Sequence, residues 1–355
     1  MTTTQVRFFT LLVFITSLST SKLHSQALRF GAHVPREVET IYENGLSWLA
    51  SVQSVDGSWR TSHSGPGVTA LCAMTFLAAG EDPNFSRYGP SIRRAIRHII
   101  AQQDVETGYF GSSMYHHAFA MLALAEAYGA VNDSLLWHGD DSSDEHDSSD
   151  ETEPTHERSI ARSLDLAIRC AVNSQRLNAL GGWRYLPDKT DADPSATGTV
   201  LMGLLACRNA GLTVPDATLV GALDYLQRST GVNGYVTYSG GFGASDESVT
   251  RSAVAALVYA VSGKAETAKY QATLKHITER LEHEETTHPH YFLYYMAQAL
   301  FQGDYEAWEK WNAATIRKLT KRQAKNGSFK NDPYQTSMSL LALALNHRLL
   351  PVYER

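Results

Sequence analysis

The stretch GLSWLASVQSVDGSW, residues 45–59, joins an amphipathic helical pattern to a glutamine and then to a turn made of glycine and an aromatic residue. The same spacing returns near the C-terminus in LTKRQAKNGSF, residues 319–329, and two weaker copies lie between them. Such self-similarity is the signature of a repeat architecture. The repeated positions are Gln53, Gly57 and Trp59; Gln103, Gly108 and Phe110; Gln175, Gly181 and Trp183; and Gln323, Gly327 and Phe329.

Helical patterns flank each of these turns, so the chain is predicted to form six helical pairs. The fourth pair has a longer loop rich in Gly and Tyr, and the fifth lacks the glycine–aromatic turn. The expected pairs are 38–52 with 68–79, 91–103 with 115–128, 159–174 with 196–208, 217–228 with 248–261, 267–282 with 291–301, and 308–322 with 335–346.

The second helix of each pair is apolar on all sides and rich in small residues, as in MLALA at 121–125 and LLALA at 340–344. Helices of this kind are buried, whereas the first helices carry the charged residues of a solvated face. Proline recurs just before the second helices, where its missing N–H costs nothing. The sequence therefore predicts an all-α fold, a single α/α toroid at 28–355 with inner and outer helical rings.

The Gln–Gly–Trp spacing of residues 53–59 resembles the QW repeat of squalene and oxidosqualene cyclases. The segments 290–295 and 308–312 also resemble bacterial prenyltransferase/squalene-oxidase-repeat proteins, whose functions are mostly unassigned. This resemblance covers the chain from about residue 37 onward. It implies the α/α toroid that terpenoid cyclases share with protein prenyltransferase β subunits, and it leaves the activity open.

The composition excludes several classes of protein. With 355 residues, 43% of them hydrophobic and 19% charged, the chain is neither a disulfide-rich miniprotein nor a wholly disordered one. Eight acidic residues lie between Asp140 and Glu153, and without them the formal charge of −6 becomes +2. A nearly neutral body argues against nucleic acid as a partner. The acidic insert, at about 138–157, is too polar to order itself.

The N-terminus is typical of a signal peptide. Arg7 precedes an apolar run, Phe8 to Leu18, and small residues suit cleavage after Ala27. We therefore expect residues 1–27 to be removed and the protein to be exported to the periplasm or the exterior. The alternative is an uncleaved segment that anchors the protein to the membrane. The three cysteines lie in apolar helical patterns and are expected to be buried thiols: Cys72, Cys170 and Cys207.

The strongest chemical candidate is DADPSA, residues 191–196, just before the third inner helix. It resembles the Asp-x-Asp-Asp-Thr-Ala acid motif of squalene-hopene cyclase. That resemblance implies that Asp193 protonates an alkene with Asp191 as its partner, although Pro194 replaces the third acidic residue. The other interpretation is that Asp193 caps the helix, as Asp332 does before Pro333, and the sequence favours this cap.

The prenyltransferase resemblance implies a zinc ion held by Asp, Cys and His, with an Asp-x-Cys pair among the ligands. The sequence contains no Asp-x-Cys, and His290 alone takes the place of the zinc histidine. Because a catalytic zinc site normally needs three protein ligands, we expect no metal and no other cofactor.

Aromatic residues on the inner helices are candidates to line a central cavity. Tyr291, Tyr294 and Tyr295 stand at i, i+3 and i+4 and so share one helical face. Such a stripe serves a ligand site or ordinary packing. The predicted cavity residues are Tyr115, His116, Tyr291, Tyr294 and Tyr295.

Three functions fit these observations, and enzymatic activity stays open. The first is a binding or scaffold module for an apolar small molecule or a protein partner, with no complete catalytic set. The second is a terpenoid-cyclase-like enzyme that uses Asp193 as its acid. The third is an exported carbohydrate-active enzyme, in which Asp191 or Asp193 would pair with Glu247 and Trp59 or Trp183 would stack on sugar rings.

Overall fold

The computed structural model describes residues 34–61, 64–137, 159–238 and 248–347. All helices described below belong to one compact unit, Arg36–Arg355. The predicted signal peptide and acidic insert lie outside the described residues and stay predictions. Within the described ranges, no helix combines the length and the apolar character that a membrane crossing requires.

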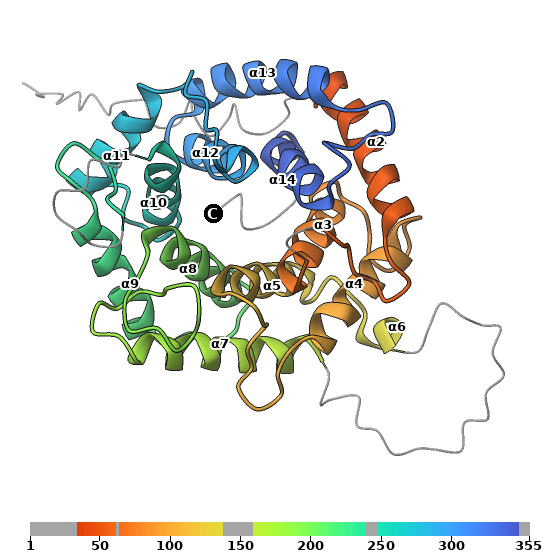
Figure 1. Cartoon of the computed structure of the whole chain (residues 1–355), viewed down its shortest axis with the longest axis horizontal. Helices are drawn as coiled ribbons and strands as arrows, with labels where there is room; N and C mark the ends of the chain where they lie inside the picture. The colour runs from red at the N-terminus through yellow and green to blue at the C-terminus, as the bar shows by residue number, and fades with distance from the viewer. Residues whose placement is uncertain (1–33, 62–63, 138–158, 239–247, 348–355) are drawn as a thin grey trace, which may run out of the picture. The chain divides into compact units, whose positions relative to one another are not determined.

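The helices of this unit form two concentric rings (Figure 1). The inner ring consists of α3 (Pro66–Ala78), α5 (Met114–Ala127), α8 (Pro194–Asn209), α10 (Val249–Val261), α12 (Pro289–Gly303) and α14 (Pro333–Leu343). The outer ring consists of α2 (Arg36–Val52), α4 (Gly89–Ala101), α7 (Ile160–Arg176), α9 (Asp216–Ser229), α11 (Ala268–Thr278) and α13 (Tyr305–Arg322). A short helix that the sequence did not predict, α6 (Asp133–Trp137), follows α5.

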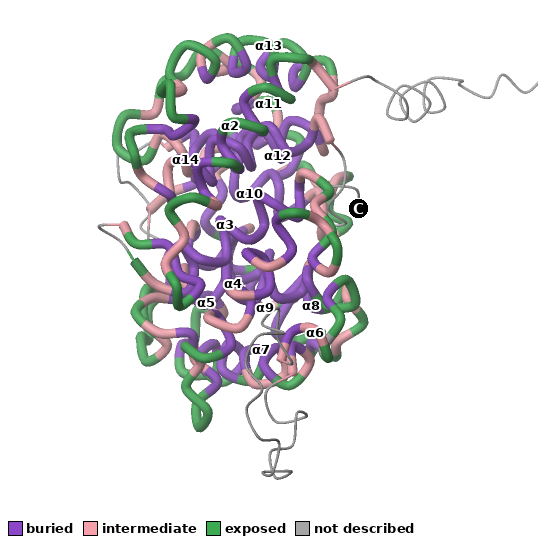
Figure 2. Tube along the Cα trace, turned by 90° about the vertical axis from the view of Figure 1, so that its right-hand side faces the viewer, coloured by how far each residue is buried: buried purple, intermediate pink, exposed green. Residues whose placement is uncertain are grey.

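Side-chain composition explains why the rings separate. Every residue of α3 is buried, and its small and apolar side chains allow close packing on all sides. The outer helix α2 buries one face only and turns its charged residues to solvent. Figure 2 shows the same division, with buried segments inside and exposed segments at the periphery. The cysteines agree with their prediction, because all three are buried and free of disulfides: Cys72, Cys170 and Cys207.

The inner ring is closed. Each inner helix contacts the next, and α14 returns to contact α3. The first outer helix also reaches the last inner one, because the Tyr42 hydroxyl of α2 donates to the Leu340 carbonyl oxygen of α14 at 2.7 Å. This closed double ring is compatible with the six pairs expected from the sequence.

Four glutamines join each glycine turn to the next outer helix. The side-chain amide of Gln53 donates to the carbonyl oxygens of Gly57 in its own turn, at 3.0 Å, and of Ser91 in α4, at 2.9 Å. The side-chain amide of Gln323 closes the outer ring, because it donates to the Ile41 carbonyl oxygen in α2. The equivalent contacts are Gln103 to Gly108 and Ser163, Gln175 to Gly181 and Thr218, and Gln323 to Gly327 and Ile41.

The fifth outer helix is shorter than predicted, since α11 ends at Thr278 and not at residue 282. Glu279 and Glu282 follow that end, and carboxylates are unfavourable at the negative end of a helix dipole. The chain is therefore free to turn inward before α12. The segment 283–288 consequently becomes part of the wall described next.

Candidate functional site

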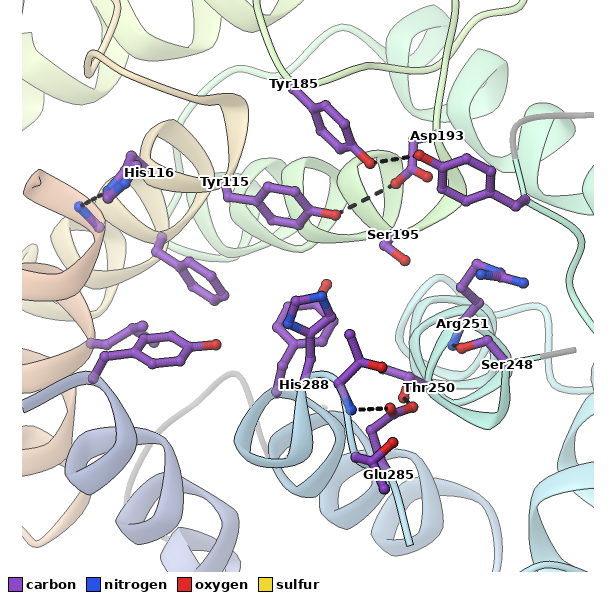
Figure 3. Close-up of a pocket in the computed structure, with 18 of the residues that line it drawn as sticks. Tyr115, His116, Tyr185, Asp193, Ser195, Ser248, Thr250, Arg251, Glu285 and His288 are labelled. Atoms are coloured by element: carbon purple, nitrogen blue, oxygen red, sulfur yellow. Dashed lines mark hydrogen bonds between the residues drawn. The ribbon is translucent and has the colours of Figure 1, made fainter. Parts of the chain in front are cut away.

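A pocket of about 840 Å³ lies where the inner helices begin. All six inner helices line it: α3, α5, α10, α12 and α14 with residues of their first two turns, and α8 with Ser195 and its N-cap Asp193. The segment 283–288 forms a further part of the wall (Figure 3). The positive ends of the inner-helix dipoles therefore face the same space. From α3, α5, α10, α12 and α14 the lining includes Val68, Leu71, Tyr115, His116, Phe119, Thr250, Arg251, Tyr291 and Tyr334.

Capping residues fix where these helices start. Ser113, Asp193 and Ser248 each accept a backbone N–H one turn into α5, α8 and α10. Such caps satisfy backbone donors that the first helical turn leaves unpaired. Proline occupies the first turn of four inner helices. The sequence thus places the first-turn side chains at the pocket.

Asp193 is both a cap and a wall residue. Its Oδ1 accepts the Ala196 N–H at 2.8 Å and lies 3.5 Å from the Tyr115 hydroxyl, which points toward it (Figure 3). The side chain is only 1% exposed. Burial raises the pKa of the Asp193 carboxyl, although the Ala196 N–H and the charges of Arg184 and Arg251 act in the opposite direction. The sequence presents helix capping and acid chemistry as alternative roles of Asp193. In the structure one carboxyl group can serve both, because it caps α8 and has a raised pKa.

Asp191 does not line the pocket, which corrects its expected place beside Asp193. Its side chain is 58% exposed and pairs with Arg184, whose Nε lies 3.5 Å from Oδ2. Arg184 also donates to the Tyr238 hydroxyl at 3.2 Å, and Tyr238 shares a hydrogen bond of 2.8 Å with the Tyr185 hydroxyl. An arginine and two tyrosines, rather than a second carboxyl group, therefore stand beside Asp193.

Three predicted cavity residues line the pocket, and two do not. Tyr115, His116 and Tyr291 face it, and His116 Nδ1 accepts the Gly67 N–H of α3 at 3.1 Å. The other two are buried in the inner ring instead. Tyr294 is enclosed by neighbouring aromatic rings, and the Tyr295 hydroxyl forms a hydrogen bond of 2.9 Å with Thr199: these are corrections to the predicted lining.

Glu285 supplies a carboxylate from a different element. Its Oε2 accepts the Thr250 hydroxyl at 3.0 Å, and its Oε1 accepts the Thr287 N–H at 2.9 Å. Partial burial acts to raise the pKa of Glu285, but these hydrogen bonds prevail and lower it. Sequence reasoning missed Glu285, Arg251 and Tyr238, because no motif surrounds them and only the fold brings them together.

The remaining candidates lie elsewhere. Trp59 and Trp183 are fully buried, and each indole N–H donates to a backbone carbonyl at 2.8 Å, so the expected sugar stacking by these residues is wrong. Glu247 lies outside the described residues. His290 Nδ1 is 2.9 Å from the Ser339 hydroxyl. Among the residues that the structure describes, no three His, Cys, Asp or Glu side chains converge as metal ligands would.

Comparison with known proteins shows the fold. No family model and no curated protein matches the chain. An inactive variant of the α-1,6-mannanase GH76A of Salegentibacter sp., in complex with α-1,6-mannotriose, is similar with 9% identity and a TM-score of 0.60, covering 88% of this chain and 99% of that one. The type II terpene cyclase MstE from Scytonema gives 15% identity, a TM-score of 0.59 and coverage of 88% and 99%. A protein from Actinoplanes is similar with 13% identity and a TM-score of 0.59, covering 87% of this chain and 99% of that one.

These similar structures are α/α toroids, so the predicted fold class is confirmed. At such low identity the likeness concerns the fold alone. The same scaffold serves two unrelated chemistries in the proteins named, so function has to be argued from the pocket.

Proposed function

We propose that the protein is a toroid that binds a small organic ligand in the pocket where the inner helices begin. The observation that carries this proposal is the Asp193 carboxyl, almost wholly buried and with a raised pKa, at the wall of an 840 Å³ pocket. Pockets of about 300–1,000 Å³ with a few convergent polar groups are typical small-molecule sites. Asp193 in its protonated form would donate a hydrogen bond to an oxygen of the ligand.

A hydroxylated ring compound, such as a sugar, fits the lining best. Among the described lining residues, only Val68, Leu71 and Phe119 have purely hydrocarbon side chains. Five tyrosines offer aromatic faces for stacking together with hydroxyl groups for hydrogen bonding. The mannanase of similar fold holds a mannotriose, which makes oligosaccharides the first ligands to test.

A terpenoid is the second candidate ligand, and it is an apolar small molecule of the kind expected from the sequence. It is supported by the Asp191-Ala192-Asp193 motif and by the aromatic faces, which stabilise carbocations. A variant of the similar MstE cyclase binds geranylgeranyl dihydroxybenzoate. Against it stands the position of Asp191 outside the pocket, which leaves Asp193 without the second aspartate of that motif.

Calorimetric titration tests the proposal. The probes are gluco-, manno- and xylo-oligosaccharides of three to six units and, in detergent, geranylgeraniol. We expect one oligosaccharide series to bind the wild type. Ser195→Trp should abolish that binding because its indole would fill the pocket, whereas the matched variant Ser195→Ala should keep it. If no probe binds, or if Ser195→Trp binds as the wild type does, the pocket proposal fails and a protein partner becomes the better hypothesis.

Export is part of the proposal and rests on the sequence of residues 1–27. Expression of residues 1–355 in a secreting bacterial host should yield mature protein that begins near Leu28, as measured by intact-mass spectrometry of the periplasmic and extracellular fractions. A chain that retains residues 1–27 in the membrane fraction would favour the anchored alternative. An intact cytosolic chain would contradict both.

A further inference from the structure

Three carboxyl groups line the pocket, and one of them, Glu284, pairs with Lys318 at 2.7 Å. The other two come from different elements. Asp193 precedes α8, and Glu285 lies in the segment between α11 and α12, ninety-two positions later in the chain. Figure 3 shows them on different walls, with the pocket between them. Asp193 is hydrogen-bonded by Ala196 and Tyr115, whereas Glu285 is hydrogen-bonded by Thr250 and Thr287, so each carboxyl group has an environment of its own.

These environments favour opposite protonation states. Asp193 is 1% exposed, and burial raises its pKa, which favours the neutral acid. Glu285 receives two donors on its two oxygens, and they keep its pKa low despite partial burial. When the environments of two carboxyl groups push their pKa values apart, the group with the higher pKa can act as the acid and the other as the base.

We infer that Asp193 and Glu285 are the acid and the base of a glycoside hydrolase site that acts on an oligosaccharide bound in the pocket. This inference rests on the proposed ligand pocket and adds to it a reaction and a second residue. The lining tyrosines combine aromatic faces with hydroxyl groups, which suits a sugar, and the carboxyl pair supplies what hydrolysis of an acetal needs.

The reaction consumes one water molecule. Asp193 gives its proton to the glycosidic oxygen while the bond between that oxygen and the anomeric carbon breaks. Glu285 takes a proton from a water molecule whose oxygen forms the new bond to the anomeric carbon from the opposite face. The products are two sugars with free hydroxyl groups, and the anomeric configuration is inverted. Glu285 then releases its proton to solvent, and Asp193 takes one back.

The second carboxylate also argues against alkene protonation at this pocket. A cyclase must keep a carbocation away from bases and from water until its rings are closed. Glu285, held charged by Thr250 and Thr287, would remove a proton or stabilise the cation too early. A hydrolase requires that same charged group.

Variant kinetics on two kinds of substrate test the inference. The substrates are unactivated oligosaccharides, followed by release of reducing ends, and 2,4-dinitrophenyl glycosides, whose leaving group needs no proton. Asp193→Asn should lose about 1,000-fold on the oligosaccharides but stay within about tenfold on the dinitrophenyl glycosides. Asparagine caps helices as well as aspartate does, so this variant should fold. Glu285→Gln should lose about 1,000-fold on both substrates.

Two further measurements make the assignment specific. Azide should restore the turnover of dinitrophenyl glycosides by Glu285→Ala and give a glycosyl azide of inverted configuration. The control is Glu282→Gln, an exposed glutamate three positions earlier that does not line the pocket, and it should keep wild-type turnover.

The outcomes separate this inference from the pocket proposal. Binding of an oligosaccharide without hydrolysis of any probe would overturn the acid–base pair and leave the pocket proposal standing. Equal losses by Asp193→Asn on both substrates, or a loss by Glu282→Gln as large as that of Glu285→Gln, would also overturn the pair. If no oligosaccharide binds, both proposals fall.

Discussion

Replacing Gly327 with alanine is expected to lower the free energy of unfolding by about 3–5 kcal/mol. Gly327 has a φ of 90°, which L-residues rarely adopt, and an added Cβ would lie 2.1 Å from the Asn44 carbonyl oxygen of α2. This turn joins the last pair to the first, so the overlap falls where the ring closes. Urea unfolding followed by circular dichroism measures the loss.

Two other glycines separate the causes of this loss. Gly129 also has a positive φ of 82°, but a Cβ there would meet nothing within 4 Å, so Gly129→Ala should cost about 1 kcal/mol. Gly111 has open space and no positive φ, and Gly111→Ala should change stability by less than about 0.5 kcal/mol. A Gly327→Ala loss no larger than that of Gly129→Ala would contradict the ring-closing contact.

Acidification is expected to destabilise the wild type through His117. This residue is 0% exposed; its Nδ1 accepts the Phe110 N–H at 3.2 Å, and its Nε2 lies 3.1 Å from the Ala167 carbonyl oxygen. Burial lowers the pKa of His117 to about 4. Because the unfolded chain takes up the proton near pH 6.5, stability is full above that pH and falls between 6.5 and 4, by about 3 kcal/mol in total.

The matched variant is His117→Thr. Thr197 and Thr336 occupy the same position in α8 and α14, and each accepts the N–H of the turn aromatic, Trp183 or Phe329, at 2.9 Å. Threonine therefore keeps the acceptor and removes the titration. Urea unfolding at pH 7.5, 6, 5 and 4.5 should show a wild-type curve that falls more steeply than that of the variant. Parallel curves would refute a role for His117, since every other titrating group is common to both proteins.

The fold could be predicted because its determinants are local and repeated. The distance from Gln53 to Gly57 suffices for one side-chain amide to bond its own turn and the next helix, and the same spacing occurs at Gln323. The all-apolar inner helices are equally visible in the sequence. The end of α11 was missed because its helical pattern continues to residue 282, whereas the accumulated glutamates end the helix earlier.

Site residues could be predicted from the sequence only where they lie at the start of an inner helix. Asp193, Tyr115, His116 and Tyr291 stand in the first turn of inner helices or just before it, and all of them line the pocket. Tyr294 and Tyr295 stand deeper in α12, so helical spacing alone misplaced them. Glu285 comes from a segment without any motif, and only the closed ring brings it opposite Asp193.

Whether the pocket between Asp193 and Glu285 binds sugar is decided by a crystal structure of the protein soaked with the oligosaccharide that binds best in calorimetry. We expect density in this pocket, with a sugar ring against one of the lining tyrosines and a ligand oxygen within hydrogen-bond distance of the Asp193 carboxyl. Density at another surface, with the pocket filled by solvent alone, would contradict this expectation.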